Sequence, residues 1–466
     1  MGLLLLSVSI AQAAASVSES APPPNAATYA APDPEVDTPT SATTIPLGRP
    51  DETKAQRDAR MAWWREARFG LFIHWGLYSV PAGIYENQYV DGYPAWIMYD
   101  AKIPVAEYAA YAAQFNPVKF DADAWVKLAE DAGTKYIVMT AKHHEGFAMF
   151  HSQVDPFNIY DATPFKRDPV AELAAACAKY GMKFGIYYSE AQDWHHPGGA
   201  FWNGEPWDPA QLGNMDDYLK NVALPQVTEL LTHYGPIAYF WYDTPVGMTP
   251  ARVAPFLALD RLQPNMIIND RLSADYQVGD TMTPEECVPD VGTLPGVDWE
   301  TCMTINDSWG YDADDSDYKS AAFILESLID VASKGGNFLL DVGPDAQGVI
   351  PAPEVKRLQA IGAWLKVNGA AIYGTGPTPF GAETTAWNWR CTTKPGMLYI
   401  SIFTWPQGHF DLSGVKGKVT KAYLLADPER HALVFSQDGG KLTVKLPDQA
   451  PDAIASVLCL EVSNPT

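Results

Sequence analysis

The stretch that decides the predicted fold is Ile237-Ala238-Tyr239-Phe240-Trp241-Tyr242-Asp243, a short apolar run that ends in one carboxylate. Such a run is typical of a strand buried on both faces, as in a parallel sheet covered by helices. Barrel enzymes carry their chemistry at the carboxyl ends of such strands. An isolated strand-end Asp more often caps the next turn. Asp243 becomes a catalytic candidate because other runs end in the same way.

Four further apolar runs lead to polar side chains. Residues 69–76 lead to His74, residues 135–147 to His143 and His144, residues 183–189 to Tyr187 and Tyr188, and residues 266–271 to Arg271. Helical patterns lie between them at 121–132 and 169–180, each followed by a glycine that can end a helix. Strand, polar end and helix, repeated in this order, predict a β/α barrel whose polar ends meet at one mouth.

The later part of the chain changes character. Two more strands are expected at 299–305 and 337–343, followed by helices at 318–333 and 352–368. After about residue 378 only short β-rich runs remain, at 397–403, 419–425, 432–435, 442–446 and 455–462, with turns such as Asp438-Gly439-Gly440. We therefore predict an α/β fold with an irregular (β/α) TIM-like barrel over residues 51–376 and a C-terminal antiparallel β-sandwich over residues 377–466.

The N-terminus predicts export. An apolar core at residues 3–10 precedes Ala11-Gln12-Ala13, which fits a small-x-small cleavage site, so residues 1–14 are expected to be a signal peptide. This core is too short to span a bilayer. Residues 15–50 are rich in Ala, Pro, Ser and Thr and are expected to be a linker. We expect a periplasmic or secreted protein.

Charge and cysteine content exclude some partners. The 56 acidic residues outnumber the 32 basic ones, which argues against binding to nucleic acid or to an anionic membrane surface. No two of the five cysteines have the close spacing of a metal site. Cys287 and Cys302 flank one loop and are the only pair considered for a disulfide.

Glycoside hydrolysis by two carboxylates is the first chemistry that fits the polar strand ends. Asp243 is the natural nucleophile, and the acid/base candidates are Glu285, Glu286 and Glu300. Glu300 follows Trp299, an apolar neighbour of the kind that raises the pKa of a general acid. Glu285 lies in a loop, which gives a swinging acid better reach. The histidines fit as ligands of sugar hydroxyls, because a neutral imidazole offers one donor and one acceptor.

Two other functions remain open at this point. A metal-dependent hydrolase would use His143, His144 and Asp243, which are suitable ligand types. Adjacent residues of one strand point to opposite faces, however, which argues against this site. A catalytically inactive glycan-binding protein would keep the aromatic and histidine platform and would need neither carboxylate.

Several strings together resemble the α-L-fucosidases of glycoside hydrolase family 29. They lie at residues 68–76, 140–147, 187–189, 241–243 and 299–302, with further similar runs at 308–311 and 333–337. The resemblance covers nearly the whole chain after residue 50. It implies a barrel with a C-terminal β-sandwich, a retaining mechanism, neither cofactor nor metal, and release of L-fucose from the non-reducing ends of fucosylated oligosaccharides or glycoconjugates.

The resemblance also implies roles for particular residues. Asp243 matches the family nucleophile, and the acid/base is expected first at Glu300 and second at Glu285. The residues expected to line the fucose pocket are His74, Trp96, His143, His144, Tyr188, Trp241, Arg271 and Trp309. Two positions depart from the family pattern: Ala95 stands where a sugar-holding Glu is usual, and Glu145 replaces the usual Asp. Glu86 is one candidate to hold the sugar hydroxyl that Ala95 cannot bind.

Overall fold

The computed structural model describes residue 49 and residues 51–202, 204–273, 278–294, 296–381 and 388–463. The predicted signal peptide, and the predicted linker apart from Arg49, lie outside the described residues. Arg49 itself is anchored: its guanidinium donates to the carbonyl oxygens of Gln263, Pro264 and Met266. Within the described ranges, no helix is both long and apolar enough to cross a membrane.

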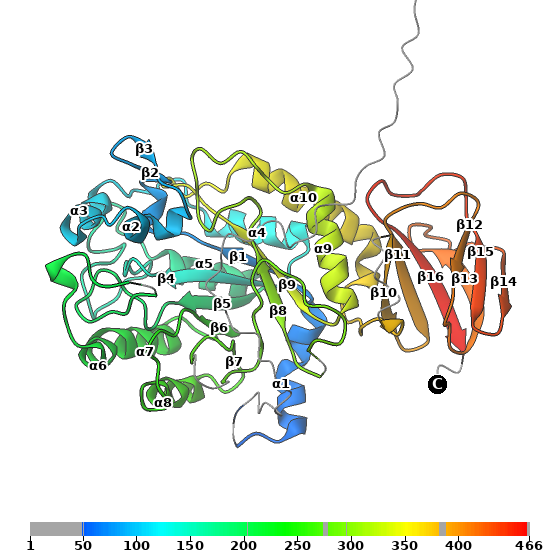
Figure 1. The fold of residues 1–466 in the computed structure, drawn as a ribbon, viewed down its shortest axis with the longest axis horizontal. Coiled ribbons are helices and arrows are strands. Elements are labelled where there is room, and N and C mark those ends of the chain that lie inside the picture. The colour runs from blue at the N-terminus through cyan, green and yellow to red at the C-terminus, as the bar shows by residue number, and fades with distance from the viewer. Residues whose placement is uncertain are drawn as a thin grey trace, which may run out of the picture. The chain divides into compact units, whose positions relative to one another are not determined.

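Seven parallel strands form a curved sheet in the order β7-β6-β5-β4-β1-β9-β8 (Figure 1). They are β1 (Phe69–Ile73), β4 (Tyr136–Lys142), β5 (Lys183–Tyr188), β6 (Tyr239–Tyr242), β7 (Ile267–Ile268), β8 (Glu300–Met303) and β9 (Asn337–Val342). Each arises from one of the seven predicted apolar runs, and all but the first residue of β5 are buried. The predicted irregular (β/α) barrel is confirmed.

Residues 280–286, here called the closing segment, lie between β7 and β8. Isolated parallel bridges join Thr281 to Asn269, Met282 to Trp299, and Glu285 to Cys302. These bridges link the closing segment to the two edge strands of the sheet, β7 and β8. The segment therefore takes the place of an irregular eighth strand of the barrel. The irregularity of the barrel is therefore concentrated at this one seam.

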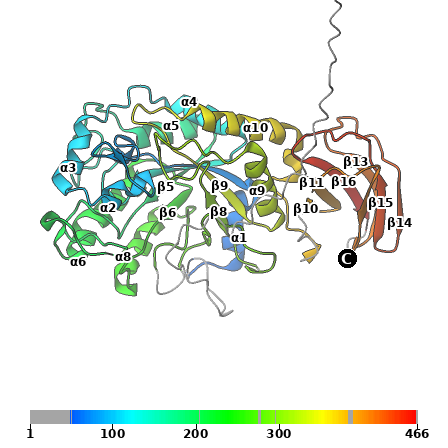
Figure 2. The same ribbon diagram turned by 45° about the horizontal axis from the view of Figure 1, so that its top comes forward.

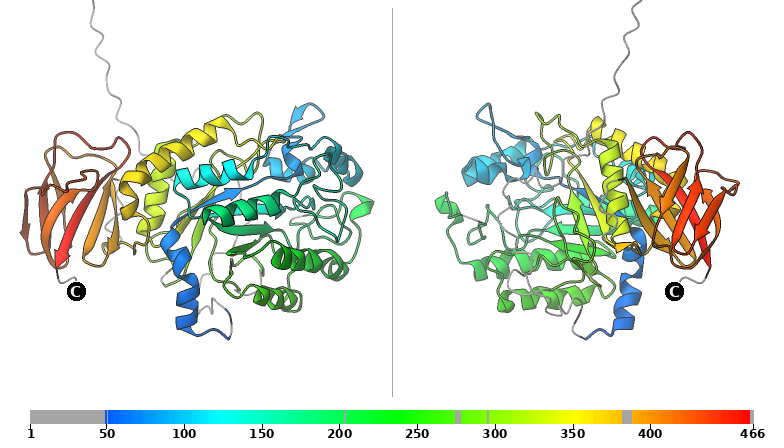
Figure 3. Two further views of the ribbon diagram at one scale, coloured as in Figure 1. Left: turned by 180° about the vertical axis from the view of Figure 1, so that it is seen from behind. Right: turned by 45° about the vertical axis from the view of Figure 1, so that its right-hand side comes forward.

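Helices cover the outside of the sheet. The main ones are α1 (Lys54–Ala67), α4 (Ala122–Ala132), α5 (Pro169–Tyr180), α7 (Leu224–His233), α8 (Pro250–Leu259), α9 (Ala321–Ser333) and α10 (Ala352–Asn368). Helices α10, α4 and α5 lie side by side in Figure 2 and, seen from behind, in Figure 3. A left-handed glycine follows each of α4 and α5, as predicted, and Asp121 and Asp168 cap their first turns. Helix α9 begins later than predicted because Ser320 caps it.

Short elements fill the loops between the main strands and helices. The extended and α-helical ones are β2 (Ile84–Tyr85), β3 (Gln88–Tyr89), α2 (Ile97–Asp100), α3 (Val105–Ala109) and α6 (Met215–Tyr218). The single turns are η2 (Leu77–Ser79), η3 (Pro94–Trp96), η4 (Ala110–Ala113), η5 (Pro209–Gln211), η6 (Leu219–Ala223), η7 (Asp260–Leu262) and η8 (Gly369–Ala371). The loop after β1 and the loop after β5 contain most of them, so these two loops build much of the rim at the carboxyl ends of the strands.

The C-terminal strands form two antiparallel sheets, in the orders β10-β11-β16-β13 and β12-β15-β14. Their bounds are β10 (Trp389–Lys394), β11 (Met397–Ile402), β12 (His409–Leu412), β13 (Lys418–Leu424), β14 (Phe435–Asp438), β15 (Lys441–Lys445) and β16 (Ser456–Ser463). The predicted sandwich and its turn at Gly439 are confirmed. The run expected at 432–435 is displaced to β14, and sequence reasoning missed β10 and β12.

The barrel and the sandwich share buried contacts. Tyr399 and Val457 belong to the same buried apolar cluster as the barrel core. The Trp364 indole nitrogen of α10 donates to the Ala455 carbonyl oxygen at 2.7 Å. Asp330 of α9 forms a buried ion pair with Arg390 of β10. Because the core continues across it, the boundary at residue 376 stays a prediction.

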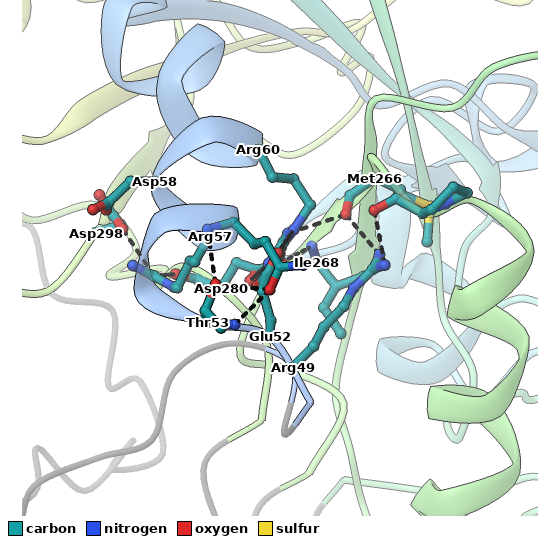
Figure 4. A network of polar contacts seen from close by, with 12 residues as sticks. Arg49, Glu52, Thr53, Arg57, Asp58, Arg60, Met266, Ile268, Asp280 and Asp298 are labelled. Carbon is teal, nitrogen blue, oxygen red and sulfur yellow. Dashed lines mark hydrogen bonds and ion pairs between the residues drawn. The ribbon is translucent and has the colours of Figure 1, made fainter.

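Buried ion pairs hold helix α1 against the closing segment (Figure 4). The guanidinium of Arg60 makes two hydrogen bonds of 2.7 Å to the carboxylate of Asp280. The same carboxylate accepts from the backbone nitrogen of Ile268 in β7 at 3.1 Å. Asp280 therefore ties the closing segment to α1 and to β7 at once, at the start of the segment.

Replacing Arg60 with Met should destabilise the protein by about 3 kcal/mol, because it leaves the buried Asp280 without its guanidinium partner. Urea unfolding followed by circular dichroism measures the change. Lys54→Met is the matched control, since the ion pair of Lys54 with Asp58 is exposed and should contribute little. Equal midpoints for the two variants would show that the buried pair does not hold this seam.

Candidate active site

Asp243 lies directly after β6, where its side chain meets residues from two neighbouring strands. It is 8% exposed. The Tyr187 hydroxyl donates to one carboxylate oxygen at 2.6 Å, and Arg271 Nη1 donates to the other at 3.0 Å. The next residue, Thr244, has φ +57°, a left-handed conformation that is rare for a β-branched side chain. The chain thus turns sharply and leaves Asp243 at the strand tip.

Arg271 connects Asp243 to the closing segment. Its Nη2 lies 2.8 Å from the Glu285 carboxylate, while Nε donates to the Thr283 hydroxyl at 3.0 Å. The guanidinium also sits 4.7 Å from the ring centre of Trp241. A planar fork of donors can satisfy several oxygens in fixed directions, which a lysine cannot do. Two carboxyl groups are thereby held close to one cation.

His144 is held in one tautomer beside Asp243. Its Nδ1 is 2.7 Å from the Ser189 hydroxyl, whose own proton goes to the Gln192 carbonyl oxygen. Nδ1 must therefore be the donor, and Nε2 keeps its lone pair. Burial lowers the pKa of His144 well below its usual range, so the ring is neutral. Nε2 lies 3.6 Å from an Asp243 oxygen and is available as an acceptor.

The other two predicted histidines lie in the same cluster. The Asp341 carboxylate of β9 orients His74 through a 2.7 Å contact to Nδ1. His143 stacks on Tyr187, with ring centres 5.4 Å apart and planes inclined by 12°. Burial lowers the pKa of His143 well below its usual range, and the neighbouring histidines lower it further. Imidazole nitrogens that can meet sugar hydroxyls therefore surround Asp243.

Aromatic rings form the remaining walls. Trp241 stacks on Tyr187, with ring centres 5.6 Å apart, and Trp309 lies 4.8 Å from His74. Trp96 is half-buried and packs on His144 at 5.2 Å. All three predicted aromatics thus adjoin the residues around Asp243, and they offer the flat apolar surfaces that a sugar ring needs.

His143 and His144 do not lie on one strand, contrary to our expectation. Strand β4 ends at Lys142, so His143 and His144 both lie beyond it and need not alternate between faces. Their ring centres are 4.0 Å apart. Even so, in the ranges that the structure describes, no three His, Cys, Asp or Glu side chains gather in an arrangement that could hold a metal ion.

Glu300, the first choice as acid/base, lies at the amino end of β8, whereas Asp243 follows the carboxyl end of β6. It begins β8 and is 0% exposed. Tyr136, the first residue of β4, donates to its carboxyl group, and the Trp241 indole nitrogen lies 3.4 Å away on the other side. Burial raises the pKa of Glu300 to about 7, although these hydrogen bonds oppose the rise. The Trp241 ring thus separates this acid from the cluster around Asp243.

Glu285, the second choice, lies where an acid can act. Its side chain is 30% exposed, and its carboxylate shares Arg271 with Asp243. It pairs with Cys302, two residues or about 6.5 Å further along β8 than Glu300. The third acid, Glu286, is bound to the backbone nitrogen of Thr304 at 2.6 Å.

Tyr188, which was expected to line the pocket, does not face Asp243 in the structure. Its hydroxyl donates to Gln226 of α7 at 2.7 Å, on the outer face of β5. Successive strand residues face opposite sides, so Tyr187 is the one that faces Asp243. Both tyrosines were visible in the sequence, but the register was not. Asp341 was also missed, although it lies near the end of an apolar run, the signal that identified Asp243.

The two departures from the family pattern, Ala95 and Glu145, each lie next to a residue of the site. Ala95 is buried, and its backbone nitrogen donates to the Trp309 carbonyl oxygen at 3.3 Å. Glu86 is exposed in the turn between β2 and β3, so the structure gives no support to its suggested role in holding the sugar. Burial raises the pKa of Glu145 to about 8, and its carboxyl group lies 3.8 Å from His143.

The loop cysteines are not bridged. Cys287 and Cys302, the pair considered for a disulfide, do not form one in the structure. The Cys302 thiol instead lies 3.9 Å from Arg271 Nη2. It is therefore part of the buried wall behind the guanidinium.

Comparisons with known proteins agree on one family. The alpha-L-fucosidase family model matches residues 42–370. The tissue alpha-L-fucosidase of Bos taurus is 30% identical over 453 residues, covering 89% of this chain and 91% of the bovine one. The crystal structure of alpha-L-fucosidase from Vibrio sp. strain EJY3 shows 35% identity and a TM-score of 0.81, covering 87% of this chain and 73% of that one.

A further similar structure is a trapped covalent intermediate. It is an alpha-L-fucosidase from Bacteroides thetaiotaomicron in complex with 2-fluoro-fucosyl fluoride, 29% identical, with a TM-score of 0.80 and coverage of 90% of this chain and 100% of that one. Family, fold and the cluster around Asp243 point the same way. The chain belongs to the α-L-fucosidase family and is a glycoside hydrolase of that type.

Proposed function

We propose that the protein is an exo-acting, retaining α-L-fucosidase that removes terminal α-L-fucose from glycans through a covalent glycosyl-enzyme. The observation that carries this proposal is the Asp243 carboxylate, aimed by Tyr187 and Arg271 at the carboxyl end of β6. The trapped covalent intermediate of the similar Bacteroides enzyme supports the covalent step. The substrates are fucosylated oligosaccharides or glycoconjugates.

The reaction proceeds by two displacements. Asp243 attacks the anomeric carbon and forms a carbon–oxygen bond, while the bond to the leaving oxygen breaks and that oxygen takes a proton from the acid. Water then attacks the same carbon, gives its proton to the acid residue and releases Asp243. Retaining pairs of carboxyl groups lie about 5 Å apart. The guanidinium of Arg271, shared by Asp243 and Glu285, keeps this pair close.

Glu285 is our choice for the acid/base. An acid that protonates a leaving group must reach the rim, where the rest of the glycan departs. Glu285 is partly exposed on the closing segment, whereas Glu300 is enclosed at the amino end of β8. The polar contacts of Glu300 with Tyr136 and Trp241 give it a role in the barrel core.

Imidazole groups and aromatic rings would bind the sugar. The His144 Nε2 lone pair can accept a proton from a hydroxyl group, and His74 presents Nε2 while Asp341 holds its Nδ1. Trp309 offers an apolar surface for the methyl group at C5. We further propose a periplasmic or secreted location, which the apolar residues 3–10 and the Ala11-Gln12-Ala13 site support. An inactive lectin is not favoured, because both carboxyl groups are present and share one cation.

Loss of the nucleophile should abolish turnover. We expect Asp243→Gly to hydrolyse a nitrophenyl α-L-fucoside at least about a thousandfold more slowly than wild type. Added azide should restore the rate and give the β-fucosyl azide, because azide attacks where the carboxylate stood. EDTA should leave the wild-type rate unchanged. The proposed function would be wrong if the folded wild type hydrolysed no α-L-fucoside. Loss of activity in EDTA would instead support the metal-dependent hydrolase.

The two candidate acids can be separated by leaving-group dependence. Glu285→Ala should lower kcat/KM by about 10²–10⁴-fold for a fucosyl disaccharide, whose leaving oxygen needs a proton. A dinitrophenyl fucoside needs little acid assistance and should lose much less in its first step. Glu300→Gln should change both rates by less than about tenfold. The opposite pattern in steady-state kinetics would return the acid/base role to Glu300.

The buried Glu300 should also make the free energy of unfolding depend on pH. Its pKa is raised from 4.5 to about 7 in the folded protein, so the native state holds a proton that the unfolded chain releases. Wild type should therefore lose up to about 3 kcal/mol relative to Glu300→Gln as pH rises from 5 to 8. Urea unfolding of both proteins across this range measures the difference. A difference that does not vary with pH would contradict the neutral buried acid.

A further inference from the structure

Glu190 is a buried acid beside the nucleophile for which the reaction so far has no use. It lies two residues after the end of β5, the strand next to β6, and its exposed fraction is 0%. One carboxyl oxygen accepts a hydrogen bond from the backbone nitrogen of Asp243 at 3.1 Å. The other oxygen has no hydrogen-bond partner among the described residues. A buried carboxyl group in this condition calls for a physical explanation.

The surroundings of Glu190 favour its neutral form. The ammonium group of Lys142 is already occupied by Asp193 and by Tyr218, each at 2.7 Å. Burial raises the pKa of Glu190 well above its usual range, and the Asp243 carboxylate raises it further against the hydrogen bond from the Asp243 backbone. A neutral acid can sit beside Asp243 without the repulsion that a second carboxylate would bring.

Strand pairing stops just before Asp243, so side chains must take over there. The parallel register of β6 ends at Phe240 on the β7 side and at Tyr242 on the β5 side. Beyond Phe240, the Asn269 amide group accepts from the Tyr242 nitrogen at 2.9 Å and donates to the Tyr242 oxygen at 2.8 Å. Glu190 then takes the next backbone donor, that of Asp243. Backbone donors left over at the end of a buried ladder need such partners.

We propose that Glu190 is a positioning residue for the nucleophile. Its carboxyl oxygen fixes the Asp243 peptide, so that Tyr187 and Arg271 orient the carboxylate from a backbone that does not move. The inference rests on the proposed function, because it assigns Glu190 a part in the displacement by Asp243. Misplacing a reacting group by about 1 Å can cost about a hundredfold in rate.

Three variants test the hydrogen bond on an aryl α-L-fucoside. Glu190→Met keeps the length of the side chain and removes the acceptor, so kcat should fall at least about tenfold with KM within about twofold of wild type. Glu190→Asp withdraws the oxygen by one methylene and should lose kcat in the same way. Glu190→Gln puts an amide oxygen in the same place and should recover kcat to within about threefold of wild type.

A double variant separates positioning from general damage. In an Asp243→Gly background no carboxylate remains to be aimed, so adding Glu190→Met should leave the azide-rescued rate within about twofold. A distorted site would lower the rescued rate as well. Asp260→Asn is the matched control: Asp260 is a buried acid that binds the Tyr242 hydroxyl at 3.1 Å, so its loss should lower the melting temperature and spare kcat.

Each outcome decides the matter. A wild-type kcat in Glu190→Met and Glu190→Asp overturns the inference. So does a Glu190→Met change that lowers the rate equally in the wild-type background and in the azide-rescued Asp243→Gly background. If the folded wild type hydrolyses no α-L-fucoside, the proposed function fails and the inference fails with it. A wild type that turns over and a Glu190→Met variant that loses kcat only when Asp243 is present support both.

Discussion

The arrangement of the candidate active site depends on one half-buried guanidinium, that of Arg271. Arg271 binds Asp243 and Glu285, which come from different parts of the barrel, and its plane faces Trp241. A cation taken out of water requires opposite charge and hydrogen bonds to offset its desolvation. The two carboxyl groups provide that compensation, and in doing so they are brought close to each other. The ion pairs that stabilise Arg271 thus also hold Asp243 and Glu285 close together.

That contact is possible only because the closing segment completes the barrel. One end of the segment is fixed by Asp280, which joins Arg60 of α1 to the β7 backbone. The other end carries Glu285 into reach of Arg271. A segment with isolated bridges in place of a ladder gives up regular pairing and needs such anchors. Ion pairs at both ends therefore join the stability of the seam to the placement of the acid.

Much of the architecture was predictable because short local sequence patterns determine it. The apolar runs of all seven barrel strands, and the aspartates and glycines that bound α4 and α5, are visible without any long-range information. Of the polar residues that follow the runs, His74, His144 and Arg271 do lie around Asp243 or beside it. The sandwich was harder to predict, since the sequence patterns of β10 and β12 are too weak to indicate a strand.

By itself, then, the sequence determined which residues end the strands and that a carboxylate lies among them, because burial and turn chemistry act over a few neighbouring residues. Only the tertiary structure decided which of two tyrosines faces Asp243, since one residue of register reverses the side of a strand. It also placed Glu285 and Glu300 at different heights in the barrel, and our proposal of Glu285 as the acid/base rests on that difference. The hydrogen bond from the Asp243 backbone nitrogen to Glu190 was also visible only in the tertiary structure. It joins residues that are distant in sequence and that come together only across β5 and β6.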